Sequence, residues 1–160
     1  MLLRKRAWDI MRPPMSGVSI GASVAEAMRV LDAVMATTPD CHTILVETED
    51  GDVAGSLSIW DVLRHLDAAM GRDPDLRDEA SPGHENTVRA AWARLAATPL
   101  VDIMDPHVPL IAPGDPLSLV LEKMLLNGRT MAVVTDAGKV LGTLHVDDVY
   151  AMVSKTVAAL

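Results

Sequence analysis

The feature that most constrains this chain is an internal repeat that covers most of its length. The stretch Gly142-Thr143-Leu144-His145-Val146-Asp147-Asp148-Val149 has the same layout as the upstream stretch Gly55-Ser56-Leu57-Ser58-Ile59-Trp60-Asp61-Val62. In addition, Trp8-Asp9-Ile10-Met11-Arg12-Pro13 recurs 93 residues later as Val101-Asp102-Ile103-Met104-Asp105-Pro106. Repetition on this scale predicts two similar structural units that share a core.

Each copy of the first stretch reads as a short strand that runs into a helix. A glycine opens the apolar strand, a polar residue (Ser58 or His145) follows three positions later, and an aspartate (Asp61 or Asp148) follows three after that. The first N–H groups of a helix lack internal partners and carry partial positive charge, so this junction favours an anion. The aspartate beside it can accept hydrogen bonds from paired hydroxyls, such as those of a ribose.

The pattern of apolar runs and turn residues divides the chain into three parts. Residues 1–70 are expected to form the first unit, with a helical lead-in over residues 2–10. Residues 71–85 are rich in Gly, Pro, Asp and Arg and are expected to be an exposed linker loop. Residues 86–160 are expected to form the second unit with its own lead-in helix, which Asn86 and Thr87 would cap.

Composition and charge narrow the possible functions. The formal net charge of −8 and the pI near 4.9 argue against binding to nucleic acid. The single cysteine, Cys41, fits a reducing compartment, and no apolar run is long enough to span a membrane. We therefore expect a cytoplasmic protein without a membrane partner. The sequence has no phosphate-loop or dinucleotide-binding motif and no zinc spacing among its histidines, so no catalytic residue, metal ligand or required cofactor is predicted.

Together these motifs resemble the cystathionine-β-synthase (CBS) domain, and their tandem arrangement resembles a Bateman module. The resemblance lies in Asp-Ile-Met-x-Pro, in the acidic-Gly turns Glu49-Asp50-Gly51 and Asp136-Ala137-Gly138, and in Gly-x-x-[Ser/Thr]-x-x-Asp. It implies an α/β (α+β) fold of two β-α-β-β-α units related by pseudo-twofold symmetry. It also implies a stand-alone regulatory module, not an enzyme, that binds AMP, ADP, ATP or S-adenosylmethionine in the cleft between the units.

The same resemblance implies roles for individual residues. It places the ribose of the ligand on Asp61 and Asp148. Phosphate and other polar contacts are expected from Ser58, His145, His42 and Arg129. His145 departs from the family pattern, because Ser or Thr is usual at its position. The adenine is expected against six apolar residues: Val18, Ile20, Ile44, Val108, Ile111 and Ala132.

A second interpretation of the repeated motif needs no ligand. Ser58 and Asp61 have the spacing of a capping box, which would stabilise the helix whether or not a ligand binds. The alternative function is therefore a structural protein-interaction module whose clefts are empty or filled by their own side chains, with His145 as the candidate occupant. On either interpretation, the apolar helices over residues 60–70 and 146–160 are expected to dock a second copy in a homodimer, or a regulated partner protein.

Overall fold

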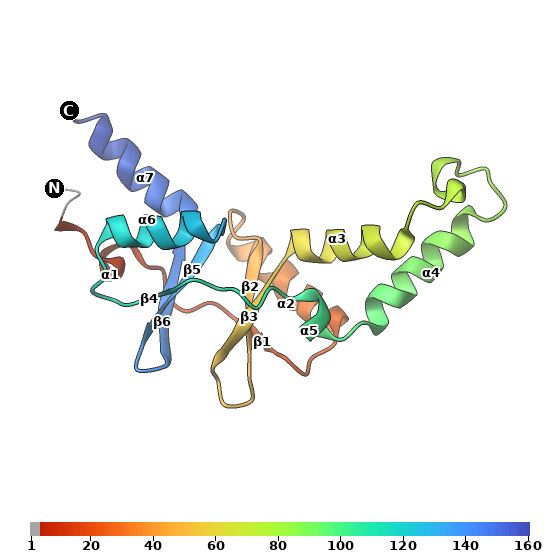
Figure 1. Ribbon diagram of the computed structural model, residues 1–160, viewed down its shortest axis with the longest axis horizontal. Coiled ribbons are helices and arrows are strands. Elements are labelled where there is room, and N and C mark those ends of the chain that lie inside the picture. The colour runs from red at the N-terminus through yellow and green to blue at the C-terminus, as the bar shows by residue number, and fades with distance from the viewer. Residues whose placement is uncertain (1–3) are drawn as a thin grey trace.

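The computed structural model describes residues 4–160 and has two small sheets at its centre (Figure 1). The strands of the first sheet are β1 (Gly17–Ser19), β2 (Thr43–Glu47) and β3 (Val53–Ser58), and those of the second are β4 (Leu110–Ile111), β5 (Met131–Asp136) and β6 (Lys139–His145). In each sheet the first two strands are parallel and the last two are antiparallel. Leu45 of β2 packs with Met131 and Val133 of β5, so the two central strands face each other.

Helices cover the outer faces of both sheets. The helical elements are α1 (Ala7–Ile10), α2 (Val24–Thr37), α3 (Ile59–Met70), the 3-10 helix η2 (Pro74–Arg77), α4 (His84–Ala97), α5 (Leu100–Ile103), α6 (Leu117–Leu126) and α7 (Val146–Val157). Helices α2 and α3 pack on the first sheet, and α6 and α7 pack on the second. The predicted fold of two β-α-β-β-α units is thereby confirmed. Among residues 4–160, no helix is long and apolar enough to cross a membrane.

The stretch between the units is more ordered than a simple loop. Helices α3 and α4 form an arm that extends away from the sheets (Figure 1). Asp75 holds the turn between them, since its carboxylate accepts a 2.6 Å hydrogen bond from Ser81 and its carbonyl lies 2.8 Å from the His84 ring. Helix α4 consequently begins at His84, before the expected caps Asn86 and Thr87.

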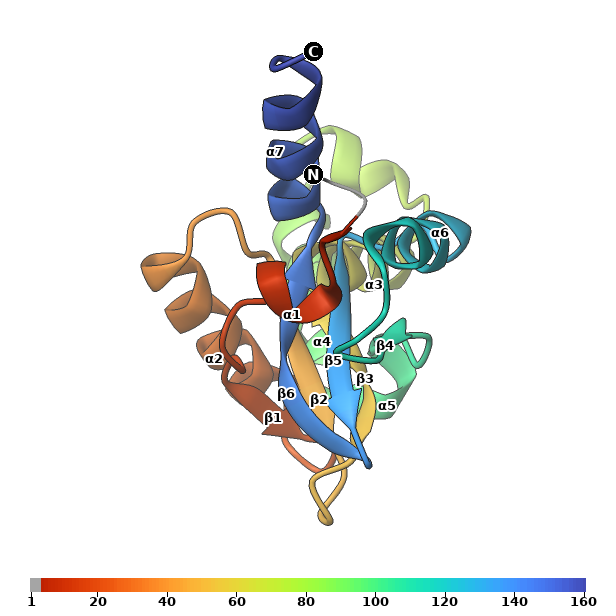
Figure 2. The same cartoon turned by 90° about the vertical axis from the view of Figure 1, so that its left-hand side faces the viewer.

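The lead-in segments cross between the two units. Helix α1 packs on the second unit, where Ala7 is fully buried with Ile111 and Leu117 (Figure 2). Helix α5 packs on the first unit, where Leu100 and Ile103 join the core. Each unit thus takes part of its core from the other half of the chain. Of the helix expected over residues 2–10, α1 forms only the last four residues, and residues 2 and 3 lie outside the described part of the chain.

Backbone bridges fix both crossings at equivalent places. Arg12 and Thr143 exchange hydrogen bonds of 2.8 and 3.1 Å, and Ser56 and Asp105 exchange bonds of 2.9 and 2.8 Å. The residue before each strand partner is a glycine, Gly142 or Gly55. A Cβ at either glycine would lie well inside 3.0 Å of the carbonyl oxygen of the crossing segment. The absence of a side chain at these positions therefore allows the crossing.

We expect Gly142→Ala to destabilise the protein by about 1–3 kcal/mol, because the added methyl group displaces the Arg12 backbone from β6. Gly55→Ala should have a similar effect on the Asp105 crossing. Chemical denaturation followed by circular dichroism measures both. Gly114→Ala is the matched control, because its Cβ would meet nothing within 4 Å. Equal stability of all three variants would contradict the proposed importance of the crossings.

Candidate functional site

A first cleft lies at the N-terminus of α3, where the two units meet. It is lined by Ser56, Ser58, Asp61 and Arg64 of the first unit and by Arg129 and Thr130 of the second. Ser58 caps α3, and the Asp61 carboxylate accepts hydrogen bonds of 2.8 Å from both the backbone N–H and the hydroxyl of Ser58. The Ser58 hydroxyl in turn accepts a hydrogen bond from the backbone N–H of Asp61. The carboxylate uses only its Oδ2 in these contacts, so the nearest charged group to its Oδ1 is the Arg64 guanidinium, at 3.9 Å.

Arg129 brings a positive charge into this cleft from the other unit. Its guanidinium pairs with Asp105, the residue that crosses to the first sheet. Asp105 in turn accepts a 2.8 Å hydrogen bond from the backbone N–H of His107. Within residues 4–160, the Nε of Arg129 is the buried side-chain polar atom that lacks a hydrogen-bond partner. A buried donor without an acceptor is costly, so this guanidinium is not fully satisfied by the pair with Asp105.

A central groove continues the first cleft toward the second unit. It is lined by Asp40, His42 and Trp60 of the first unit and by Thr130, His145 and Asp147 of the second. The first cleft and the groove share Thr43, Trp60, Thr130 and Met131 in their walls. Their volumes are about 100 and 230 Å³, so together they approach the size of a small-molecule site.

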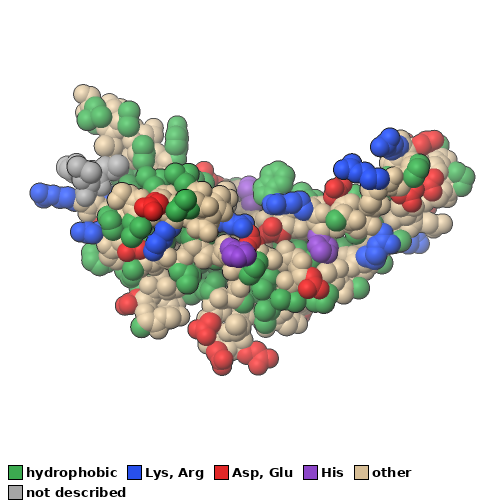
Figure 3. Space-filling model, viewed as in Figure 1, with side chains coloured by type: hydrophobic (Ala, Val, Ile, Leu, Met, Phe, Trp, Pro, Cys, Tyr) green, Lys and Arg blue, Asp and Glu red, His purple; other side chains and the backbone are tan. Residues whose placement is uncertain are grey.

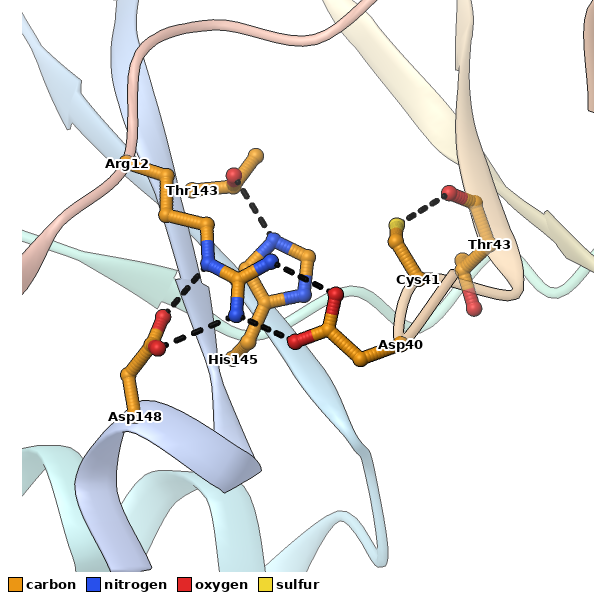
Figure 4. Close-up of polar contacts among 7 residues, drawn as sticks. All are labelled: Arg12, Asp40, Cys41, Thr43, Thr143, His145 and Asp148. Atoms are coloured by element: carbon orange, nitrogen blue, oxygen red, sulfur yellow. Dashed lines mark hydrogen bonds and ion pairs between the residues drawn. The ribbon is translucent and has the colours of Figure 1, made fainter. Parts of the chain in front are cut away.

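A second cleft of about 330 Å³ occupies the equivalent place on the other side. It is lined by Arg12, Met15, Thr38 and Cys41 of the first unit and by Thr143 and His145 of the second. Arg12, in the wall of this cleft, forms the Arg12 cluster with Asp40 and Asp148 (Figure 4). The Arg12 guanidinium donates to both oxygens of Asp148 at 2.6 and 3.0 Å, and to both oxygens of Asp40 at 3.2 and 2.6 Å. Both oxygens of Asp148 are therefore already engaged.

The charges in this cluster shift the pKa values of its members. Hydrogen bonds to Asp148 and then to Asp40 raise the pKa of Arg12. The hydrogen bond from Arg12 lowers the pKa of Asp40. Burial, followed by the positive charge of Arg12, lowers the pKa of His145, whose side chain lies 3.1 Å from the Thr143 hydroxyl. His145 is 5% exposed and neutral near pH 7, so it fills part of this cleft without adding charge.

The structure places the predicted site residues in three different environments. Ser58, Asp61 and Arg129 line the first cleft, whereas His42 and His145 line the central groove. Asp148 is held by Arg12. The residues predicted to hold the adenine lie in or against the hydrophobic cores: Val18, Ile20, Ile44, Val108, Ile111 and Ala132.

The strand register also shows that His42 and Arg129, both predicted as polar contacts, are not equivalent positions of the repeat. Thr43 pairs with Ser58 and Met131 pairs with His145, so Thr43 is the counterpart of Met131. Cys41, and not His42, is therefore the structural counterpart of Arg129.

Several polar residues of the site were not predicted from the sequence. Arg12 and Asp105 are the main ones, and Arg64 and Asp40 lie beside them. A signal for the first two was present, because they occupy the same position, before the proline of Asp-Ile-Met-x-Pro, and carry opposite charges. This charge inversion makes the two otherwise equivalent clefts electrostatically different. The described part of the chain brings together no group of three or more His, Cys, Asp or Glu suited to a metal ion.

Comparison with known proteins shows a family match for this chain. The family model described as CBS domain matches residues 7–68 and 100–155, well over half of the chain. No curated protein gives a significant match.

Several solved structures have a similar fold. One is a CBS domain-containing protein of unknown function from Bacillus anthracis, with 16% identity, a TM-score of 0.71 and 96% coverage of both chains. Another is CBSX2 in complex with AMP, with 18% identity, a TM-score of 0.64 and coverage of 94% of this chain and 97% of that one. A third is the CBS domain pair of MJ0100 with 5′-methylthioadenosine and S-adenosyl-L-methionine, with 17% identity, a TM-score of 0.67 and coverage of 95% and 98%.

The lowered pKa of His145 implies a specific dependence of stability on pH. An unfolded histidine takes up a proton near its ordinary pKa of about 6.5, whereas the folded protein resists this protonation. We therefore expect stability to fall as the pH decreases from about 7 toward the lowered pKa of His145. His145→Gln removes this titration and should give a shallower slope over pH 7 to 5 in denaturation experiments. Identical slopes for the two proteins would contradict the assignment.

Proposed function

The chain belongs to the CBS domain family, and we propose that it is a regulatory module that binds one adenosine-containing ligand in the first cleft. The observation that carries the proposal is the meeting of Asp61 and Ser58, at a helix N-terminus of one unit, with Arg129 from the other. The complexes of CBSX2 with AMP and of the MJ0100 pair with adenosine derivatives support this ligand class.

The geometry suggests how such a ligand binds. The free Oδ1 of Asp61 accepts from the ribose hydroxyls, as the family resemblance implies. A phosphate lies near the N-terminus of α3, where Ser58 and the first N–H groups of the helix are available. The guanidinium of Arg129, which lines the cleft from the other unit, supplies positive charge for the phosphate. The adenine extends into the central groove, which continues the cleft.

Charge favours a phosphorylated ligand in this cleft. Arg64 and Arg129 balance Asp61 and Asp105 there. In contrast, the second cleft sets Arg12 against Asp40 and Asp148, with Asp147 in the adjoining groove. An anion approaching the second cleft therefore meets a net negative charge. AMP, ADP or ATP is accordingly the ligand that we propose for the first cleft.

Binding in the first cleft would regulate by linking the two units. Arg129 belongs to the second unit and Ser58 to the first, so a phosphate that contacts both favours one arrangement of the units over others. We propose no catalysis at this site. The Ser58 hydroxyl is engaged by Asp61, and burial raises the pKa of the Cys41 thiol, which donates to the Thr43 carbonyl.

The internal pairing at the second cleft gives the alternative function specific support. Arg12 and His145 line that cleft, and Arg12 engages Asp148, so side chains of the chain itself take up part of the site. Exposed apolar side chains also gather on the helices. Leu63 on α3 and Tyr150 on α7, which are equivalent positions of the repeat, are 52% and 71% exposed. Hydrophobic side chains are prominent over α6 and α7 (Figure 3). We propose that the exposed faces of α3 and α7, which carry Leu63 and Tyr150, dock a second copy in a homodimer. Such a dimer is compatible with ligand binding.

We expect Asp61→Asn to weaken binding of AMP or ATP at least tenfold, which is about 1.4 kcal/mol, because a hydroxyl then loses a charged acceptor. Asp148→Asn is the matched control and should leave the affinity unchanged, since Arg12 already engages that carboxylate. Isothermal titration calorimetry measures both variants, and thermal unfolding without ligand confirms that each is folded. An effect of Asp148→Asn as large as that of Asp61→Asn would contradict the assignment to the first cleft.

We expect the protein to sediment as a dimer, and Leu63→Glu with Tyr150→Glu to produce monomers, because buried unpaired carboxylates oppose association. Analytical ultracentrifugation gives the mass directly. Trp92→Glu is the control, because Trp92 is similarly exposed, at 59%, but lies on α4. A wild-type protein that remains monomeric at tens of micromolar would exclude the dimer.

A further inference from the structure

We propose that the second cleft is a latent binding site for a cationic adenosine derivative, and that the Arg12 side chain occupies it in place of the ligand. The inference rests on the proposed function, because it assigns to Asp148 the same chemistry as Asp61. In the wild-type chain the aspartate of this site is engaged by an internal guanidinium. Removal of that group would open a second site with a different charge preference from the first.

The position of Arg12 identifies it as an occupant of a ligand site. Asp148 lies at the same place in α7 as Asp61 in α3, since each is the third residue of its helix. Asp61 has its Oδ1 largely free, whereas both oxygens of Asp148 accept from Arg12. The guanidinium therefore takes the hydrogen bonds that ribose hydroxyls would take at the equivalent carboxylate.

The backbone of Arg12 is held independently of its side chain. It exchanges two hydrogen bonds with Thr143, and the backbone N–H groups of Ala7 and Trp8 donate to the segment before α6 at 2.9 and 3.1 Å. The Arg12 side chain is 25% exposed, and its partners Asp148 and Asp40 are 32% and 45% exposed. Partly exposed ion pairs are weak compared with buried ones, so the guanidinium can leave while the crossing segment stays in place.

The charges around Arg12 select the kind of ligand. Once the guanidinium is removed, Asp40 and Asp148 face the space, with Asp147 nearby in the central groove. His145 is neutral near pH 7 and adds no compensating charge. The opened cleft would therefore attract a sulfonium or ammonium group and repel a phosphate. Among adenosine derivatives, S-adenosylmethionine carries both of these cationic groups.

The test compares wild type, Arg12→Ala and the double variant Arg12→Ala/Asp148→Asn by calorimetry with S-adenosylmethionine. We expect Arg12→Ala to gain one binding event per chain, at least tenfold tighter than any binding that wild type shows beyond the first cleft. The double variant should lose this gain. Arg6→Ala is the matched control, because Arg6 lies on the same segment but donates to the Gly114 carbonyl and not to the Arg12 cluster.

AMP serves as the anionic comparison and separates the two proposals. Binding of AMP to wild type reports on the first cleft, and it should be unchanged in Arg12→Ala. If wild type binds no AMP, the proposed function fails, whereas the gain for S-adenosylmethionine can still appear. A folded Arg12→Ala variant that binds S-adenosylmethionine no better than wild type overturns the inference.

A second probe tests the cavity without any nucleoside. Ethylguanidinium at low millimolar concentration should fit the space left by the Arg12 side chain. It should therefore raise the melting temperature of Arg12→Ala but not that of wild type or of the double variant. An equal response of all three proteins would show that the carboxylates do not form a cation site, and would overturn the proposal.

Discussion

The structure depends on the exchange of backbone hydrogen bonds where each lead-in segment crosses to the opposite unit. Arg12 joins the edge of β6 beside Gly142, and Asp105 joins β3 beside Gly55. These contacts place α1 in the core of the second unit and α5 in the core of the first. Because each core is completed by the other half of the chain, the two units are held in one arrangement. The clefts between them are consequences of that arrangement.

The same crossings also bring charge to the clefts. Each crossing residue stands beside the N-terminus of a helix that begins with the repeated motif, so its side chain determines what that motif faces. Asp105 is paired with Arg129, which lines the first cleft, whereas Arg12 lines the second cleft and is paired with Asp148. A single charge inversion at equivalent positions therefore turns a symmetric fold into two different sites. We propose that the first accepts an anion, whereas the carboxylate of the second is engaged by Arg12.

Much of the fold was predictable from the sequence, because the repeat, the capping residues and the apolar strands are local signals. The capping box at Ser58 and the aspartates of the motif are examples. The crossing of the lead-ins was not predictable, because isolated bridges between distant residues leave no periodic pattern. The Arg12–Asp148 pair spans 136 positions. The one signal available in the sequence was the opposite charge of Arg12 and Asp105 at equivalent positions of the repeat. It does not identify the residues with which these two side chains pair.

A crystal structure of the protein grown with AMP tests the inequivalence of the two clefts most directly. We expect density for the nucleotide between Asp61 and Arg129, with the phosphate beside Ser58. The Arg12 guanidinium should remain on Asp148 in the same crystal. A nucleotide bound at Asp148 with Arg12 displaced, or equal occupancy of both clefts, would show that the two clefts are equivalent.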